Sequence, residues 1–272
     1  ITKSSSGYPF VYVEKDGIYG YDPKDPLVKA QSKEKISFTP KHHDKVNNVF
    51  AGAKKAHALY DDVKMGSLFT EKAVQWIEEN KEDPFFLYFA TTHIHHPFTP
   101  DKRFEGTSEC GPYGDFIHEL DWMVGEVLQK LDDLGLRDNT LVILTSDNGG
   151  MYNAGGRQAW SMGHRLNGPL LGFKFGALEG GHRVPMIASW PGHVEANTTS
   201  DQLFSQVDML ATMAALVGEE IPEGEACDSK NLLDALVGNP KEPLREQLIV
   251  CSRNKNVVAL RWNNWVFLSG QG

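Results

Sequence analysis

The chain is poor in cysteine and has no long apolar segment. Its three cysteines are Cys110, Cys227 and Cys251 among 272 residues; they show no metal-binding spacing, and their odd number leaves at least one unpaired. They therefore do not indicate a redox compartment. No apolar run approaches the ~20 residues of a membrane-spanning helix. No signal peptide is visible after Ile1. We therefore expect no membrane partner.

An excess of positive charge is also missing. The chain has 27 Lys and Arg against 36 Asp and Glu, a formal net charge of −9. This balance argues against a nucleic-acid or anionic membrane surface. An anionic substrate would need local cations to overcome this field. The hydrophobic content of 40% and the length suit one large α/β domain or slightly more.

The most informative stretch is residues 140–150. Residues 141–145 are apolar or β-branched without clear alternation, which predicts a strand buried on both faces. The turn sequence that follows places Asp147 and Asn148 at its carboxyl end, where open α/β sheets bind ligands. Carboxylate and amide oxygens suit a hard cation such as Ca²⁺ or Mg²⁺. The alternative is an Asx-turn that closes an ordinary βα connection.

Hydrophobic periodicity predicts the other elements. Thr70 is expected to cap a helix through Asn80, residues 85–90 to form a second buried strand, and residues 113–131 to form an amphipathic helix ended by Gly135. This strand–helix–strand order predicts a βαβ unit with parallel strands. The remaining predictions are a strand near 10–13, a glycine-rich loop over 150–183, a strand at 185–190, a helix over 203–217, and an antiparallel meander at 248–251, 257–262 and 265–268.

Three histidines follow the predicted strand at 85–90. His93 and His95 share a face of an extended chain, so they are candidates for a zinc pair. The alternative is surface-loop histidines before Pro97. Because this loop and the loop of Asp147 leave carboxyl ends of strands joined by one crossover, we expect both to face the same crevice.

Residues 172–185 supply a candidate cation. Glycines here permit close backbone approach, and Lys174 offers a mobile point charge suited to a tetrahedral oxyanion. The alternative for Lys174 is a solvated surface lysine. Glu179 and Arg183 can simply pair with each other.

Together these segments resemble the sulfatases of the alkaline-phosphatase superfamily, of the arylsulfatase A and N-acetylgalactosamine-6-sulfatase type. The resemblance covers about residues 65–220, in the family's order and spacing. It rests on four segments: Pro84-Phe85-Phe86-Leu87-Tyr88-Phe89-Ala90 before His-x-His-His-Pro; Tyr113-Gly114-Asp115 with Glu119-Leu120-Asp121; Thr145-Ser146-Asp147-Asn148-Gly149; and Lys174 five residues before Glu179-Gly180-Gly181.

The resemblance implies an alkaline-phosphatase-like α/β sandwich with a largely parallel central sheet flanked by helices. Residues 1–240 would be the later part of the catalytic domain, and residues 241–272 the start of a C-terminal antiparallel subdomain. It implies a sulfuric ester hydrolase acting on a sulfated small molecule or glycan, in a periplasmic, secreted or lysosomal location. Oligomeric state is not implied.

The resemblance also assigns roles. It implies that Asp147 and Asn148 are calcium ligands, that His95 hydrogen-bonds the sulfate and the leaving-group region, and that Lys174 binds a sulfate oxygen. It gives His93 and His96 no role.

The family's nucleophile motif, Cys-x-Pro-Ser-Arg or its serine variant, is absent. Cys110-Gly111-Pro112 imitates two of its positions but lacks the arginine, so we do not assign Cys110 as the nucleophile. The formylglycine and the remaining calcium ligands are expected upstream, and this chain alone is expected to be inactive. Two alternatives stay open: a phosphatase or phosphodiesterase of the same superfamily, which typically shows Asp-His where this chain has Asp147-Asn148, and a non-catalytic pseudo-sulfatase.

Overall fold

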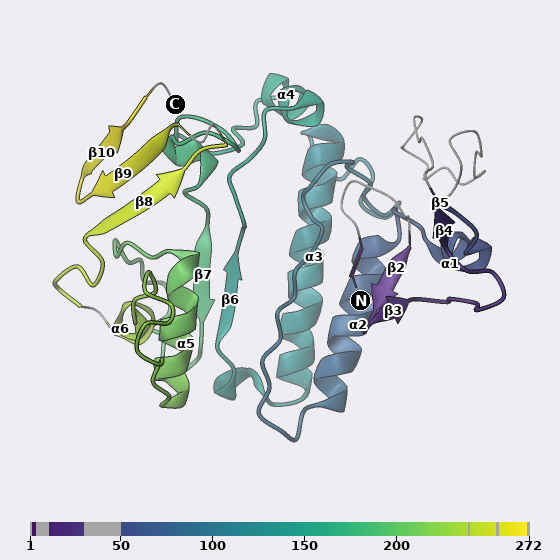
Figure 1. Ribbon diagram of the computed structural model, residues 1–272, viewed down its shortest axis with the longest axis horizontal. Coiled ribbons are helices and arrows are strands. Elements are labelled where there is room, and N and C mark those ends of the chain that lie inside the picture. The colour runs from purple at the N-terminus through teal and green to yellow at the C-terminus, as the bar shows by residue number, and fades with distance from the viewer. Residues whose placement is uncertain (1, 4–10, 30–49, 239, 254–255, 271–272) are drawn as a thin grey trace. The chain divides into compact units, whose positions relative to one another are not determined.

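A computed structural model describes residues 2–3, 11–29, 50–238, 240–253 and 256–270 (Figure 1). The chain divides into two compact units, which are described separately. Unit 1 comprises Ile1–Gly135 and Asn153–His164, and unit 2 comprises Leu136–Tyr152 and Arg165–Gly272. The boundary predicted at residue 240 stays a prediction. None of the described helices has the length and apolar character needed to cross a membrane.

Unit 1 is built around two long helices. Its helices are α1 (Lys54–Leu59), α2 (Met65–Glu79), α3 (Gly111–Asp133) and α4 (Ala154–Ser161). Its strands are β1 (Thr2–Lys3), β2 (Tyr12–Glu14), β3 (Gly17–Ile18), β4 (Val28–Lys29) and β5 (Phe50–Ala51). The strand predicted at 10–13 corresponds to β2, although residue 10 lies outside the described part.

The long helices α2 and α3 lie side by side (Figure 1) and share a core. This core contains Tyr12, Tyr60, Met65, Phe69 and Met123. The helix predicted at 113–131 is confirmed, and Gly135 follows it with φ +67°, as expected for a C′ glycine. The N-cap prediction for Thr70 is wrong. Its hydroxyl donates to the Gly66 carbonyl at 2.8 Å inside α2, which begins at Met65, nearly two turns earlier than predicted.

The segment predicted as a second buried strand has no regular secondary structure. Residues 85–90 form no strand among the described residues. Phe85, Leu87 and Phe89 are half-buried, and Phe86 and Tyr88 are 75% and 81% exposed. Only one face is therefore covered. Parallel pairing with residues 141–145, which belong to the other unit, stays a prediction. The apolar run did not distinguish burial on one face from burial on two.

The predicted glycine-rich loop contains a helix that the sequence did not indicate. In α4, Asn153 is the N-cap, and its side-chain oxygen accepts from the Gly156 backbone N–H at 3.0 Å. This helix packs near the beginning of α3 (Figure 1). Two glycines in its first turn hid the helical pattern, because glycine disfavours helix. A side chain at Gly155 would collide with Phe98, so close packing requires that glycine.

Near the start of unit 2 lies the strand that precedes Asp147 and Asn148. Strand β6 (Val142–Thr145) pairs with β7 (Met186–Ser189), so both strands are confirmed. The pairing is antiparallel, with Val142 opposite Ser189 and Thr145 opposite Met186. Each strand is at most half-buried, and every described strand pair is antiparallel. The prediction that residues 141–145 are buried on both faces is therefore wrong, and their parallel pairing with residues 85–90 stays a prediction.

The helices of unit 2 follow the predicted pattern with a later start. The helical segments are η1 (Arg137–Asn139), η2 (Glu179–Gly181), η3 (Gln206–Asp208), α5 (Met209–Val217) and α6 (Leu233–Val237). The helix predicted over 203–217 starts only after Ser205, which forms a capping box with Asp208. Gly218 ends it with φ +79°.

Asp208, the residue before α5, has a buried carboxylate that binds the side chain of Arg245, much later in the chain. Its oxygens accept from Arg245 Nε at 3.0 Å, from Arg245 Nη2, and from the Lys230 backbone N–H at 2.9 Å. Neither side chain of the ion pair is more than 8% exposed.

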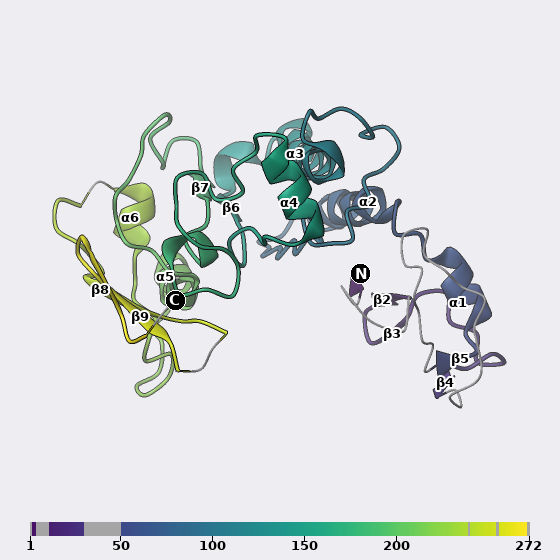
Figure 2. The same cartoon turned by 90° about the horizontal axis from the view of Figure 1, so that it is seen from above.

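The predicted C-terminal meander is confirmed. Strands β8 (Gln247–Cys251), β9 (Val258–Trp262) and β10 (Trp265–Leu268) form an antiparallel sheet in the order β10-β9-β8. This sheet lies on the side of α5 and α6 (Figure 2). Val257 and Ala259 pack with Ala177 in a small buried cluster. The sheet is therefore fixed to the segment that follows Lys174.

Candidate functional site

Three of the four residues predicted from the sequence line one cavity in unit 2. Asp147, Asn148 and Lys174 border a cavity of about 450 Å³, within the size range of small-molecule sites. The loop after β6 provides the first two residues. The glycine-rich segment before η2 provides Lys174, and the end of β8 closes the cavity with residues 250–253.

The loop after β6 lines this cavity with Asp147 and Asn148. Asp147 is exposed and Asn148 is half-buried. The Asn148 side-chain nitrogen donates to the Gly149 carbonyl at 3.0 Å, which leaves the side-chain oxygen as the available acceptor. The Ser146 hydroxyl donates to the Asn148 backbone carbonyl at 3.1 Å and tightens the turn.

Backbone contacts hold the segment of Lys174 against this loop. The Lys174 N–H donates to the Gly150 carbonyl at 2.9 Å, and the Gly149 N–H donates to the Gly181 carbonyl at 3.0 Å. A Cβ at Gly149 would lie 1.9 Å from the Gly180 oxygen. Only glycine at 149 permits this approach, and the approach places Lys174 beside Asp147.

The described residues supply part of a calcium site. Asp147 and Asn148 offer two oxygen donors, the type that Ca²⁺ prefers, but Ca²⁺ takes ~6–8 ligands. The described residues hold no group of three or more His, Cys, Asp or Glu side chains arranged for a metal. Asp147 and Asn148 therefore fit calcium as two ligands of a larger set.

Two cations of the cavity share one aromatic ring. Lys174 Nζ lies 5.5 Å from the centre of the Phe175 ring, and the Arg253 guanidinium carbon lies 4.9 Å from it. Phe175 itself has φ +81°, in the left-handed region that few non-glycine residues adopt.

Sequence reasoning missed His182 and Arg253 as cavity residues. His182 follows η2, and burial lowers its pKa from the ordinary value of 6.5, an effect that Glu179 opposes and Arg261 reinforces. Its Nδ1 is buried without a hydrogen-bond partner in the described part of the chain. Because His182 directly follows Gly180-Gly181, in the same glycine-rich segment as Lys174, the sequence could have indicated it as a cavity residue. Arg253, far along the chain in a hairpin, carried none.

Glu179 connects the segment after Lys174 to the C-terminal sheet. Its carboxylate pairs with Arg261 of β9 and with Arg183, the latter at 3.3 Å. The predicted pairing of Glu179 with Arg183 is thus confirmed, and Arg261 is an additional partner that joins η2 to the C-terminal sheet.

The histidines of unit 1 have different environments. His93 Nε2 lies 3.3 Å from Glu119 Oε2, and both side chains are fully buried. The ring of His93 also lies 3.9 Å from that of Phe116, centre to centre. His93 is therefore placed in the interior against α3. Pairing of His93 with His95 at a zinc ion is not supported by this arrangement.

The half-buried His95 stacks on His96 with ring centres 4.3 Å apart. The Nδ1 atom of His95 lies 2.6 Å from the His96 backbone carbonyl. Because a carbonyl only accepts, Nδ1 carries the hydrogen and Nε2 is the nitrogen left for chemistry. That His95 faces the same crevice as Asp147 stays a prediction, because the two residues belong to different units.

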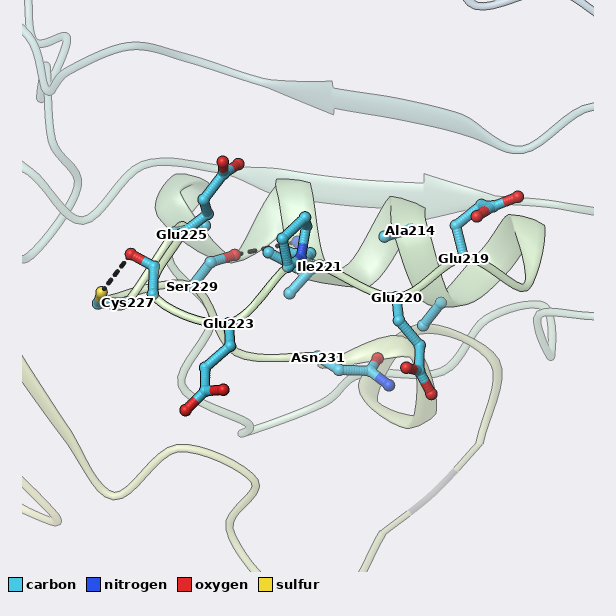
Figure 3. A pocket seen from close by; sticks show the side chains of 14 residues that line it. Ala214, Glu219, Glu220, Ile221, Glu223, Glu225, Cys227, Ser229 and Asn231 are labelled. Carbon is cyan, nitrogen blue, oxygen red and sulfur yellow. Dashed lines mark hydrogen bonds between the residues drawn. The ribbon is translucent and has the colours of Figure 1, made fainter.

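A second cavity in unit 2, of about 520 Å³, is acidic. Figure 3 shows the carboxylates of Glu219, Glu220, Glu223 and Glu225 pointing in different directions around it. Diverging carboxylates neither converge on a metal nor attract an anion.

Cys110, in unit 1, is the residue before α3, and its N–H donates to the Ser108 hydroxyl at 3.0 Å.

Comparison with known proteins identifies the family. The Sulfatase family profile matches residues 26–219. An N-acetylgalactosamine-6-O-sulfatase of Bacteroides thetaiotaomicron is 35% identical over 283 residues, covering 96% of this chain and 54% of that protein. The human N-acetylgalactosamine-6-sulfatase is 40% identical over 177 residues, covering 65% of this chain and 33% of that protein.

Solved structures agree. One, from work on the metabolism of multiple glycosaminoglycans by B. thetaiotaomicron, superimposes with a TM-score of 0.84 at 34% identity, covering 96% of this chain and 58% of that chain. A sulfatase from Pseudoalteromonas sp. gives a TM-score of 0.67 at 28% identity, over 75% of this chain and 40% of that one. The chain thus spans about half the length of the first of these relatives. It belongs to the sulfatase family and has the family's alkaline-phosphatase-like α/β fold.

Proposed function

We propose that the protein containing this chain hydrolyses a sulfate ester of a sugar, and that this chain supplies Asp147, Asn148, Lys174 and His95 to the reaction. The observation that carries the proposal is the cavity of unit 2. It brings two oxygen donors and a lysine without a carboxylate partner in the described residues to one place. A protein of net charge −9 needs such a local cation to bind an anion.

The chain's own residues account for binding and charge stabilisation. The Lys174 ammonium binds a sulfate oxygen and stabilises the negative charge that grows on the sulfuryl group. His95 acts through Nε2, because its Nδ1 hydrogen is engaged by the His96 carbonyl. In its protonated form, Nε2 donates to the bridging oxygen as the sulfur–oxygen bond breaks, so that the sugar leaves as an alcohol.

Asp147 and Asn148 would hold calcium, which when bound neutralises charge on the sulfate oxygens. An amide oxygen at 148 suits calcium better than zinc, whose preferred ligands are nitrogen and sulfur. Asparagine at position 148 therefore favours a sulfatase over the related two-zinc phosphatases. The nucleophile, expected as formylglycine, is not encoded by any Cys/Ser-x-Pro-Ser-Arg motif in this chain.

The relatives suggest the substrate class. Two of them, 35% and 40% identical, are named for sulfate at position 6 of N-acetylgalactosamine. We therefore propose a 6-sulfated amino sugar within a glycan as the substrate.

The test is Lys174→Ala in the full-length protein, with Lys241→Ala as the control because Lys241 is exposed and does not line the cavity. Lys174→Ala should lower kcat/KM for N-acetylgalactosamine 6-sulfate by about 10²–10³-fold, as loss of one oxyanion-binding group does, with an unchanged melting temperature. Equal activity in both variants would refute the role of Lys174. Absence of turnover in the unmodified full-length protein would refute the proposed function.

A further inference from the structure

Arg253 lies at the rim of the cavity that contains Lys174. It follows β8, and its backbone N–H donates to the Phe175 carbonyl at 2.9 Å. This bond ties the hairpin of the C-terminal sheet to the residue after Lys174. The two cations then lie against the same Phe175 ring, at 5.5 Å for Lys174 and 4.9 Å for Arg253.

Two further contacts fix the C-terminal sheet, which carries Arg253, to the segment after Lys174. Arg261 of β9 pairs with Glu179, and the buried Val257 and Ala259 pack on Ala177. Both contacts join the C-terminal sheet to the segment that begins at Lys174. Arg253 is therefore presented to the cavity from a fixed backbone.

The cavity is lined by one carboxylate, Asp147, and by two cations, Lys174 and Arg253. Arg183 and Arg261 do not line it, and both pair with Glu179. Within the described residues, neither Lys174 nor Arg253 has an ion-pair partner. An exposed cation–π contact is weak, so the Phe175 ring leaves the hydrogen-bonding capacity of the Arg253 guanidinium unused.

One sulfate ester carries a single negative charge, which in the proposed function meets Lys174 and the calcium that Asp147 and Asn148 would hold. The positive charge of Arg253 is then not needed to bind the sulfate that is cleaved. Its planar guanidinium can grip a carboxylate or a sulfate with two parallel hydrogen bonds, which an ammonium cannot. The cavity of about 450 Å³ has room for a sugar that carries such a group besides the scissile ester.

We propose that Arg253 is a specificity residue that binds a second anionic group of the substrate, a carboxylate or a further sulfate, distinct from the sulfate that is cleaved. The inference rests on the proposed function for the identity of the first anion. The shared chemistry of the second anion is a planar or tetrahedral oxyanion on a neighbouring position of the glycan.

The experiment compares three substrates in the full-length protein: N-acetylgalactosamine 6-sulfate, the same sugar linked to a uronic acid, and the 4,6-disulfated sugar. Arg253→Ala should lower kcat/KM about 10–100-fold for a substrate with a second anion, mainly through KM, as loss of a charged hydrogen bond does. The singly charged substrate should change less than about twofold. If Arg253→Ala loses activity on the uronic-acid-linked substrate, the second anion is a carboxylate; if it loses activity on the 4,6-disulfated substrate, the second anion is a sulfate. Arg253→Lys should recover only part of the loss.

The matched control is Arg183→Ala, since Arg183 is exposed and does not line the cavity. Calorimetric binding of the unsulfated uronic-acid disaccharide and of the 4-sulfated sugar provides a second readout that needs no turnover. Loss of this binding in Arg253→Ala supports the inference even if the full-length protein cleaves no sulfate ester, in which case only the proposed function fails. Equal binding of both probes by Arg253→Ala and the unmodified protein, or an equal kinetic loss on all three substrates, overturns the inference.

Discussion

His93 Nε2 lies 3.3 Å from Glu119 Oε2 in the interior of unit 1, with both side chains fully buried. Glu119 Oε2 also accepts from the Asp101 backbone N–H at 3.0 Å. The Glu119 carboxylate therefore connects α3 to two chain segments, the histidine loop and the turn before α3. Since His95 lies only two residues after His93, this buried contact also sets where the loop of His95 begins.

Replacing Glu119 should destabilise unit 1. Glu119→Ala removes the acceptor of the buried Asp101 N–H, and leaving this buried donor unsatisfied costs about 1–3 kcal/mol. Urea unfolding of the full-length protein measures the loss. Glu126→Ala is the control, because Glu126 lies exposed on the same helix. A change of less than about 0.5 kcal/mol for Glu119→Ala would contradict the role of Glu119.

The calcium ligands can be tested independently of activity. Asp147→Ala and Asn148→Ala in the full-length protein should each weaken calcium binding, because each removes one oxygen donor. Asp201→Ala, at an exposed position away from the cavity, is the control. Metal analysis after dialysis against a calcium buffer gives the readout. Undiminished calcium content in both variants would remove Asp147 and Asn148 from the proposed ligand set.

His182 should make stability depend on pH on the acid side of neutrality. Burial lowers the pKa of His182 in the folded protein below 6.5, so the unfolded chain binds a proton more readily there. The stabilising contribution is complete above about pH 6.5 and is lost as the pH falls through the folded pKa. His182→Gln should therefore flatten the fall in Tm as the pH drops below about 6.5.

The control for this titration is His193→Gln, because His193 is exposed and lies outside the cavity. It should reproduce the pH profile of the unmodified protein. If the profile of His182→Gln keeps the same slope as the unmodified protein, the acid sensitivity originates elsewhere.

The choice between sulfate and phosphate tests the family's rival chemistry. With Lys174 and a single hard cation, the full-length protein should prefer a sulfate ester to a phosphate ester of the same alcohol, since a phosphate monoester carries nearly two charges at neutral pH and the related phosphatases use two metals for it. The measurement is kcat/KM for both esters after chelation and restoration with calcium or zinc. A phosphate preference restored by zinc alone would place the protein with the phosphatases.

The sequence revealed those parts of the molecule that depend on local pattern. The amphipathic repeat located α3, Gly135 and Gly218 marked helix ends, and turn chemistry placed Asp147 and Asn148 after β6. Lys174 was predicted by its glycine-rich surroundings, and the cavity brings it to Asp147. These features are encoded within a few residues, so one sequence is sufficient to find them.

Features that depend on distant neighbours were missed. The apolar run at 85–90 gave no indication that Phe86 and Tyr88 are exposed. Thr70 was read as a cap because its hydroxyl can bond either outside or inside a helix, and here it bonds the Gly66 carbonyl. Arg253 reaches the cavity only because β8 and β9 fold back onto Ala177, a contact between segments about eighty residues apart that no local motif encodes.

The Asp208–Arg245 pair closes a loop of the chain between α5 and β8. Both ends of this loop are held by buried hydrogen bonds, while the acidic segment at 219–225 lies on the surface between them. Lengthening a loop whose ends are already fixed costs little, about 0.6 kcal/mol for each doubling. This segment can therefore gain or lose residues in the course of evolution, or accept an engineered insertion, while β8 and the arginine that follows it keep their place.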